Sequence, residues 1–199
     1  MSGKRVRVIV VTDGDEMARE AIEVATKNIN GRCISLSAAR SSENATQTPA
    51  ELINLVLSAE HDPVVVMVDD TGEDGEGCGE KALRALVNHA DVNVIGVVAV
   101  ASNTPYGPGV EVSASVSREG SVIAGPVDKK GRPLRVGKLH GDTVGILRNM
   151  NIPIIIGLGD PGKMDYADEA SKGAPITTKA LQTVLEQAEK QAETAPVGT

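Results

Sequence analysis

Aromatic side chains are almost absent from this sequence, which has two tyrosines and neither phenylalanine nor tryptophan. Proteins that bind single-stranded nucleic acid usually stack the bases on aromatic rings inside a basic groove. Here the rings are few and the net charge is -7, so we expect no nucleic-acid partner. The same charge argues against unaided adsorption to an anionic membrane surface, which normally needs a polybasic patch.

Long apolar segments and cysteine frameworks are also missing. The longest uncharged apolar run, residues 94–101, is far shorter than the roughly 20 residues of a membrane-spanning helix. Residues 8–11 are too short an apolar stretch for a secretory signal peptide, so we expect the mature chain to start at Met1. Two cysteines, Cys33 and Cys78, form neither a disulfide framework nor a zinc-ligand pattern, and we expect both as free thiols.

What is present is the composition of a globular protein. The chain has 199 residues, of which 41% are hydrophobic and 24% charged, which is enough for one sizeable core. No low-complexity linker divides it. We therefore predict a single α/β domain over residues 1–193 and a flexible tail over residues 194–199.

Strand and helix signals alternate along the chain. Short apolar runs rich in Val and Ile are near-continuous, as in a parallel sheet that helices cover on both faces. The predicted strands are residues 6–11, 33–36, 64–68, 92–101 and 154–158. Helical spacing or capping predicts helices at residues 18–29, 49–59, 83–90, 142–150 and 181–188. The predicted fold class is α/β: a doubly wound, mostly parallel sheet with a Rossmann-like or Toprim-like arrangement.

A hairpin insertion is predicted at about residues 110–138. Residues 110–116 and 121–127 alternate in polarity around Arg118-Glu119-Gly120, and a second turn follows at residues 128–131. This pattern favours an antiparallel extension at one edge of the sheet.

Acidic side chains follow three of the predicted strands. Asp13 and Asp15 follow the first strand, Asp69 and Asp70 follow the third, and Asp160 follows the last. Ligands of open α/β sheets bind beyond the carboxyl ends of the strands. If these strands are neighbours, Asp13, Asp15, Asp69 and Asp160 are candidate ligands for Mg²⁺ or Ca²⁺, which prefer oxygen. The alternative is that each acid only caps a helix.

The glycine-rich segment 69–80 is a candidate ligand or partner loop. Its glycines follow G-x-G-x-G spacing, and its acids, with no basic residue among them, would repel a phosphate group. A loop that binds a cation or a partner is therefore the better interpretation. The candidate residues are Asp70, Glu73, Asp74 and Glu76, together with Lys163, which lies before the last helix and is a candidate anion contact.

An enzymatic alternative comes from Asp13-Gly14-Asp15, because an apolar strand followed by D-x-D is typical of haloacid dehalogenase-like phosphatases. Residues 159–165 are similar to the distal acidic motif of that group. In a Mg²⁺-dependent phosphohydrolase or phosphotransferase, Asp13 would be the nucleophile and Asp15 the general acid. D-x-D also occurs in Toprim domains, which need a glutamate on an earlier strand, and no strand precedes Val6. D-x-D after a strand is a weak motif.

Several segments, taken together and in order, resemble the soluble stage V sporulation protein AE family. They span nearly the whole chain, so their combination is far more specific than any one motif. The segments are Val10-Val11-Thr12-Asp13-Gly14-Asp15, Gly31-Arg32-Cys33-Ile34-Ser35, Val66-Met67-Val68-Asp69-Asp70 with Gly75-Glu76-Gly77, residues 96–102, Gly141-Asp142-Thr143-Val144 and Gly173-Ala174-Pro175-Ile176-Thr177.

The resemblance implies a non-catalytic role in sporulation and spore germination. It implies a soluble component of the assembly that moves dipicolinic acid, with calcium, across the spore inner membrane. The implied partners are other stage V A sporulation proteins, which would hold the chain peripherally at that membrane. No catalytic motif and no certain cofactor come with the family, and the sequence leaves a homo-oligomer open.

Overall fold

The computed structural model describes residues 5–13, 15–35, 48–68, 77–102, 109–141 and 144–194. In these ranges strands and helices alternate as the periodicity predicts. The strands are β1 (Val6–Val11), β2 (Arg32–Ser35), β3 (Val64–Met67), β4 (Val92–Val100), β5 (Ala114–Val116), β6 (Val122–Ile123) and β7 (Ile155–Leu158). The α-helices are α1 (Glu16–Asn28), α2 (Pro49–Leu57), α3 (Cys78–Asn88) and α4 (Pro175–Thr194), and the short 3₁₀ helices are η2 (Gly145–Asn149) and η3 (Ala170–Lys172).

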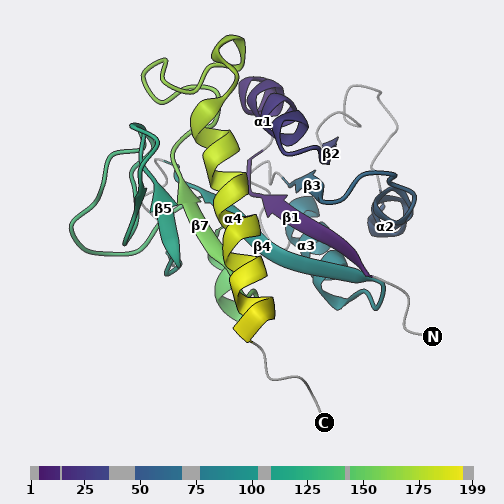
Figure 1. The fold of residues 1–199 in the computed structure, drawn as a ribbon. Helices are drawn as coiled ribbons and strands as arrows, with labels where there is room; N and C mark the ends of the chain where they lie inside the picture. Colours follow the sequence, from purple (N-terminus) through teal and green to yellow (C-terminus); the bar gives the residue numbers. More distant parts are fainter. Residues whose placement is uncertain are drawn as a thin grey trace.

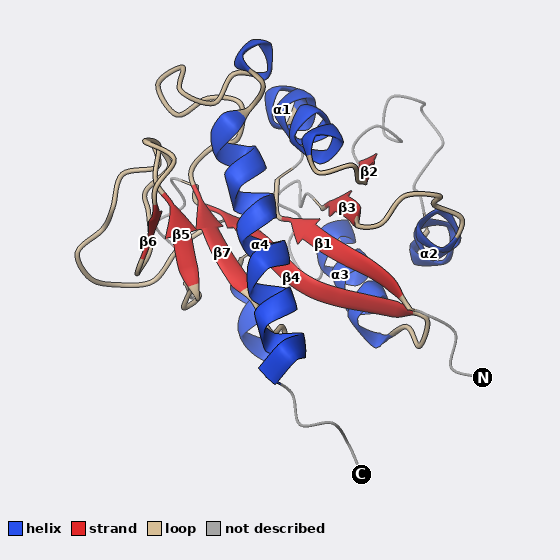
Figure 2. Ribbon diagram, viewed as in Figure 1, coloured by secondary structure: helices blue, strands red, loops and turns tan. Residues whose placement is uncertain are grey.

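All seven strands form one sheet in the order β2-β3-β1-β4-β7-β5-β6 (Figure 2). Every pairing is parallel except that of β5 with β6. The predicted fold class, a mostly parallel α/β sheet with an antiparallel extension, is therefore confirmed. The long strand β4 lies between β1 and β7, so the first and last strands of the predicted acidic crevice are not direct neighbours.

Helices cover both faces of this sheet. On one face α1 and α4 pack over side chains such as Ile9, Val98 and Ile156. On the other face α2, α3 and η2 pack over side chains such as Val10 and Val97 (Figure 1). The strands β1, β3, β4 and β7 are thus largely buried on both faces, which explains why their runs in the sequence are continuous rather than alternating.

The hairpin is shorter than predicted. Only Ala114–Val116 and Val122–Ile123 form strands, whereas residues 110–116 and 121–127 were expected to do so. The flanking residues pair elsewhere: Val110 forms a bridge with Leu139, and Val127 forms one with Pro133. β5 joins the sheet edge through parallel pairing with β7, so the insertion extends the sheet beside the end of β7.

Other boundaries also differ: α4 runs over Pro175–Thr194, whereas the sequence predicted a helix at residues 181–188. The second strand begins one residue earlier than predicted, at Arg32. The expected helix at 142–150 is the 3₁₀ helix η2 (Gly145–Asn149), and residues 142–143, where it was expected to begin, lie outside the described residues. Among the described residues, no helix is both long enough and apolar enough to cross a membrane.

Candidate functional site

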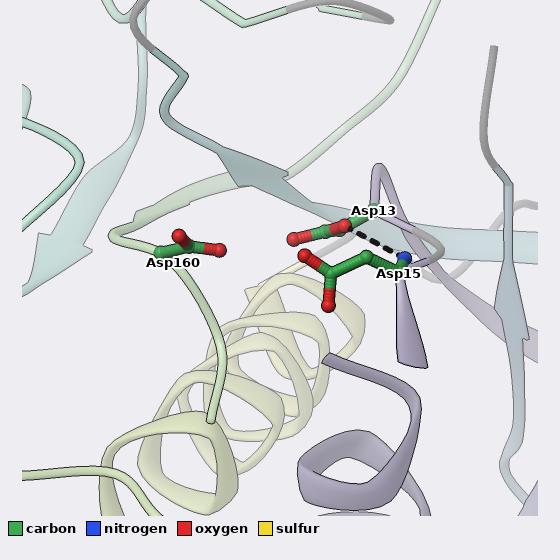
Figure 3. A group of neighbouring side chains, drawn as sticks. All are labelled: Asp13, Asp15 and Asp160. Carbon is green, nitrogen blue, oxygen red and sulfur yellow. Dashed lines mark hydrogen bonds between the residues drawn. The ribbon is translucent and has the colours of Figure 1, made fainter. Parts of the chain in front are cut away.

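Three aspartates converge at the carboxyl end of the sheet. Asp13, Asp15 and Asp160 each place a carboxylate oxygen within 4.8 Å of the others (Figure 3). Asp160 is buried, Asp13 is half-buried and Asp15 is exposed. The sequence predicted all three as metal candidates, and the fold brings them together although β4 separates β1 from β7.

The end of β1 positions the first two acids. Thr12 follows β1, and its hydroxyl accepts a hydrogen bond from the backbone N–H of Val100 at 3.0 Å. The chain then turns into α1, where Asp15 is the N-cap and accepts the N–H of Ala18 at 2.9 Å. The backbone N–H of Asp15 donates to Asp13 Oδ1 at 3.3 Å, shown dashed in Figure 3. The helix-cap interpretation is therefore correct for Asp15, which also belongs to the acidic group.

A tight turn after β7 positions Asp160. The N–H of Lys163 donates to the carbonyl of Asp160 at 3.2 Å, and Gly162 has φ of +76°. Pro161 followed by a glycine with positive φ is the pattern of a type II turn. This turn folds Lys163 back over Asp160. The backbone N–H of Asp160 also donates to the carbonyl of Lys129 at 2.8 Å, which ties the turn to the hairpin insertion.

Lys163 bridges two members of the acidic group, Asp15 and Asp160. Its Nζ lies 2.6 Å from Asp15 Oδ2 and 3.2 Å from Asp160 Oδ2. Lys129 adds a second ammonium group, 3.4 Å from Asp160 Oδ2. Asp15 and Asp160 thus contact two cations of the chain, Lys163 and Lys129.

These contacts hold Asp15 and Lys163 in their charged forms. Burial alone would raise the pKa of Asp15, but hydrogen bonds from Lys163 and from the Ala18 N–H outweigh it and lower that pKa. Burial alone would lower the pKa of Lys163, but the hydrogen bond to Asp15 and the charge of Asp160 raise it. The group is therefore an ion-paired cluster at neutral pH.

The loop that carries Lys163 is anchored by a buried acid that sequence reasoning did not single out. Asp168 is fully buried, and its carboxylate accepts the N–H groups of Gly162, Ile176 and Thr177 at 3.0, 2.8 and 2.9 Å. The hydroxyl of Thr177 donates to it at 2.5 Å. Asp168 therefore joins the turn after β7 to the first turn of α4. The signal in the sequence that could have identified Asp168 is an acidic residue seven positions before the first residue of α4.

Most of the other predicted site residues belong to the glycine-rich segment 69–80. Asp69, Asp70, Glu73, Asp74 and Glu76 lie outside the described residues. Lys163, predicted as a contact for an anion or a partner, lies instead among the strand-end acids. Lys129 was not predicted, because nothing in the local sequence places the second hairpin turn beside β7.

The family profile that matches the sequence is that of stage V sporulation protein AE1, and the match covers residues 7–188. The chain belongs to the stage V sporulation protein AE1 family. The resemblance predicted from the sequence is thus confirmed, and membership in this family implies a role related to sporulation.

Two further comparisons add little. No curated protein matches the sequence. Among solved structures, a domain of unknown function from Bordetella bronchiseptica, crystallised as a domain-swapped dimer with bound citrate, is similar at a TM-score of 0.39 with 16% sequence identity. The match covers 89% of this chain but only 41% of the other, so this chain spans less than half of that protein's length.

Proposed function

We propose that this protein is a non-catalytic sporulation and germination protein, a component of the assembly that moves dipicolinic acid, with calcium, across the spore inner membrane. The observation that carries the proposal is the family match over residues 7–188. In this proposal the chain is held peripherally at the membrane by other stage V A proteins.

In this proposal the strand-end acids are the site that binds calcium. Calcium binds carboxylate oxygens with flexible geometry, and Asp13, Asp15 and Asp160 present three carboxylates within reach of one ion. In the structure the ammonium of Lys163 lies 2.6 Å from Asp15 Oδ2 and 3.2 Å from Asp160 Oδ2, two of the three carboxylates that such an ion would bind. In our proposal Ca²⁺ displaces Lys163, so the cluster exchanges one cation for another.

The same three carboxylates would serve the alternative, a Mg²⁺-dependent phosphohydrolase with Asp13 as nucleophile. The contact between Lys163 and Asp15 opposes it. A general acid must carry a proton at the working pH, whereas the Lys163 hydrogen bond helps to lower the pKa of Asp15. We therefore favour cation binding without catalysis.

A test in cells uses an endospore-forming bacterium that encodes this protein. Spores from a strain that lacks the protein are expected to contain less dipicolinic acid or to release it more slowly during germination. A strain with Asp13→Asn and Asp160→Asn is expected to share that defect at normal protein levels. Normal dipicolinic acid content and release in the deletion strain would contradict the proposal, and turnover of p-nitrophenyl phosphate with Mg²⁺ by the purified protein would favour the phosphohydrolase.

A further inference from the structure

A second charged cluster lies outside the acidic group. The carboxylate of Asp165 is contacted by three cations from the hairpin insertion: Arg118 at 3.0 Å, Lys130 at 3.1 Å and Arg132 at 3.4 Å. The two arginines contact Oδ2 and the lysine contacts Oδ1. Guanidinium and ammonium groups that converge in this way are the usual protein environment of a bound carboxylate. In this protein the carboxylate belongs to the chain itself.

Neighbouring acids engage these cations only in part. Glu119 accepts the Nε–H of Arg118 at 2.9 Å, while the Arg118 Nη1–H donates to Asp165. Asp128 uses Oδ1 to accept the backbone N–H groups of Lys130 and Arg132. The ammonium of Lys130 and the Nη2 of Arg132 are directed instead at Asp165.

The loop that presents Asp165 adopts an unfavourable backbone conformation. Met164, Asp165 and Tyr166 have φ of +48°, +54° and +67°, a left-handed run that side chains with a Cβ resist. Met164 is buried beneath the loop, while Tyr166 beside Asp165 is 75% exposed. Met164 thus lies in the core, while Asp165 and Tyr166 lie at the surface, where the Asp165 carboxylate contacts the three cations.

The cluster is open to solvent. The side chains of Arg118, Lys130 and Arg132 are 33%, 54% and 53% exposed, and that of Asp165 is 41% exposed. An external group can therefore reach the cations without opening the core.

We propose that Arg118, Lys130 and Arg132 form a carboxylate-binding site that Asp165 occupies as an internal stand-in for the ligand. A carboxylate from a small polycarboxylate, or from an acidic segment of a partner protein, replaces Asp165 at this site. The site shares no side chain with the Asp13, Asp15 and Asp160 group, so either proposal can fail while the other stands.

Removing the carboxylate of Asp165 tests whether the three cations bind an external carboxylate. Tricarballylate and an octaglutamate peptide are each titrated calorimetrically into the wild-type protein and into Asp165→Asn. Because the free site is populated only when Asp165 has left, we expect Asp165→Asn to bind at least one of the two about tenfold more tightly than wild type. Tighter binding of tricarballylate alone identifies a small polycarboxylate as the ligand, and tighter binding of the peptide alone identifies an acidic partner segment.

A matched control distinguishes an effect at the proposed site from an effect of the change in net charge. Glu186→Gln makes the same change of charge on α4, where Glu186 pairs with Lys179 at 3.2 Å. It is expected to bind both probes as the wild type does. Adding Arg132→Gln to Asp165→Asn is expected to abolish the gain in affinity for the probe. Equal affinities in Asp165→Asn and Glu186→Gln, or a gain that survives Arg132→Gln, would overturn the proposal.

A second measurement uses the wild-type protein and so does not depend on the folding of a variant. At saturating concentrations of the probe that binds, amide hydrogen exchange in residues 163–167 is expected to increase, because Asp165 no longer ties this loop to the hairpin. Unchanged exchange there at saturation would contradict displacement of Asp165.

Discussion

Replacing Asp168 with asparagine is expected to lower the free energy of unfolding by about 3 kcal/mol. The Asp168 carboxylate is fully buried and accepts four hydrogen bonds, from Gly162, Ile176 and both donors of Thr177. An asparagine of the same shape directs an amide NH₂ at some of these donors and removes the negative charge at the start of α4. Denaturant unfolding of the wild type and the variant measures the loss.

The neighbouring acid provides the matched control. Glu169 forms an exposed ion pair with Lys172 at 2.7 Å, so Glu169→Gln is expected to change the free energy of unfolding by no more than about 0.5 kcal/mol. For a chain of this size, the loss in Asp168→Asn corresponds to a melting temperature roughly 6 to 12 °C lower. If both variants have the same melting temperature as the wild type, Asp168 does not anchor the loop that carries Lys163.

A methyl group added at Gly159 is expected to cost about 3 kcal/mol of unfolding free energy and to separate the hairpin from the site. A Cβ at this position would lie 2.6 Å from the backbone nitrogen of Gly131 and 2.9 Å from the carbonyl oxygen of Lys129. Backbone atoms cannot rotate away, and the Sδ of Met164 at 2.8 Å blocks a third direction. The second hairpin turn must therefore shift in Gly159→Ala. Thermal and denaturant unfolding measure the cost.

Lys129→Ala separates this steric effect from the loss of an ion pair. It removes the 3.4 Å contact between the Lys129 ammonium and Asp160 but leaves the backbone of the turn in place. Because the Lys129 side chain is 42% exposed, we expect a cost of at most about 1 kcal/mol. Equal losses in Gly159→Ala and Lys129→Ala would show that the ion pair, and not the close backbone approach, joins the hairpin to the sheet.

The sheet could be predicted from the sequence because each strand carries its own signal. Runs such as residues 8–11 and Val64–Met67 are apolar on both faces, which is typical of a parallel sheet that helices cover on both sides. The order of the strands has no such local signal. The position of β4 between β1 and β7 comes from long-range packing of the helices on the two faces.

The candidate site was only partly predictable for the same reason. Asp13, Asp15 and Asp160 follow strands whose carboxyl ends lie at one edge, so they were expected to converge if those strands were neighbours. They do converge, although β4 lies between β1 and β7. The role of Lys163 depends on a turn that reverses the chain over Asp160, and the role of Lys129 depends on a hairpin that pairs with β7 through β5. Both cations come from tertiary contacts that no spacing in the sequence specifies.

The hairpin strands were overestimated because alternation alone does not show which partner a residue pairs with. Val110 and Val127 fit the alternating pattern, but their partners are Leu139 and Pro133. These partners follow the second predicted turn, at residues 128–131, in a stretch for which the sequence predicted no strand. The acids of segment 69–76 remain predictions, since they lie outside the described residues.

Calcium titration of the purified protein tests the central claim most directly, namely that Asp13, Asp15 and Asp160 bind a divalent cation in exchange for Lys163. We expect saturable binding with a dissociation constant of about 0.1 to 1 mM in the wild type, loss of binding in Asp160→Asn, and tighter binding in Lys163→Gln, where the competing ammonium is gone. Glu169→Gln, which removes an acid outside the group, should bind as the wild type does. The absence of saturable binding at millimolar calcium in both the wild type and folded Lys163→Gln would contradict the claim and leave Asp15 and Asp160 as structural partners of Lys163.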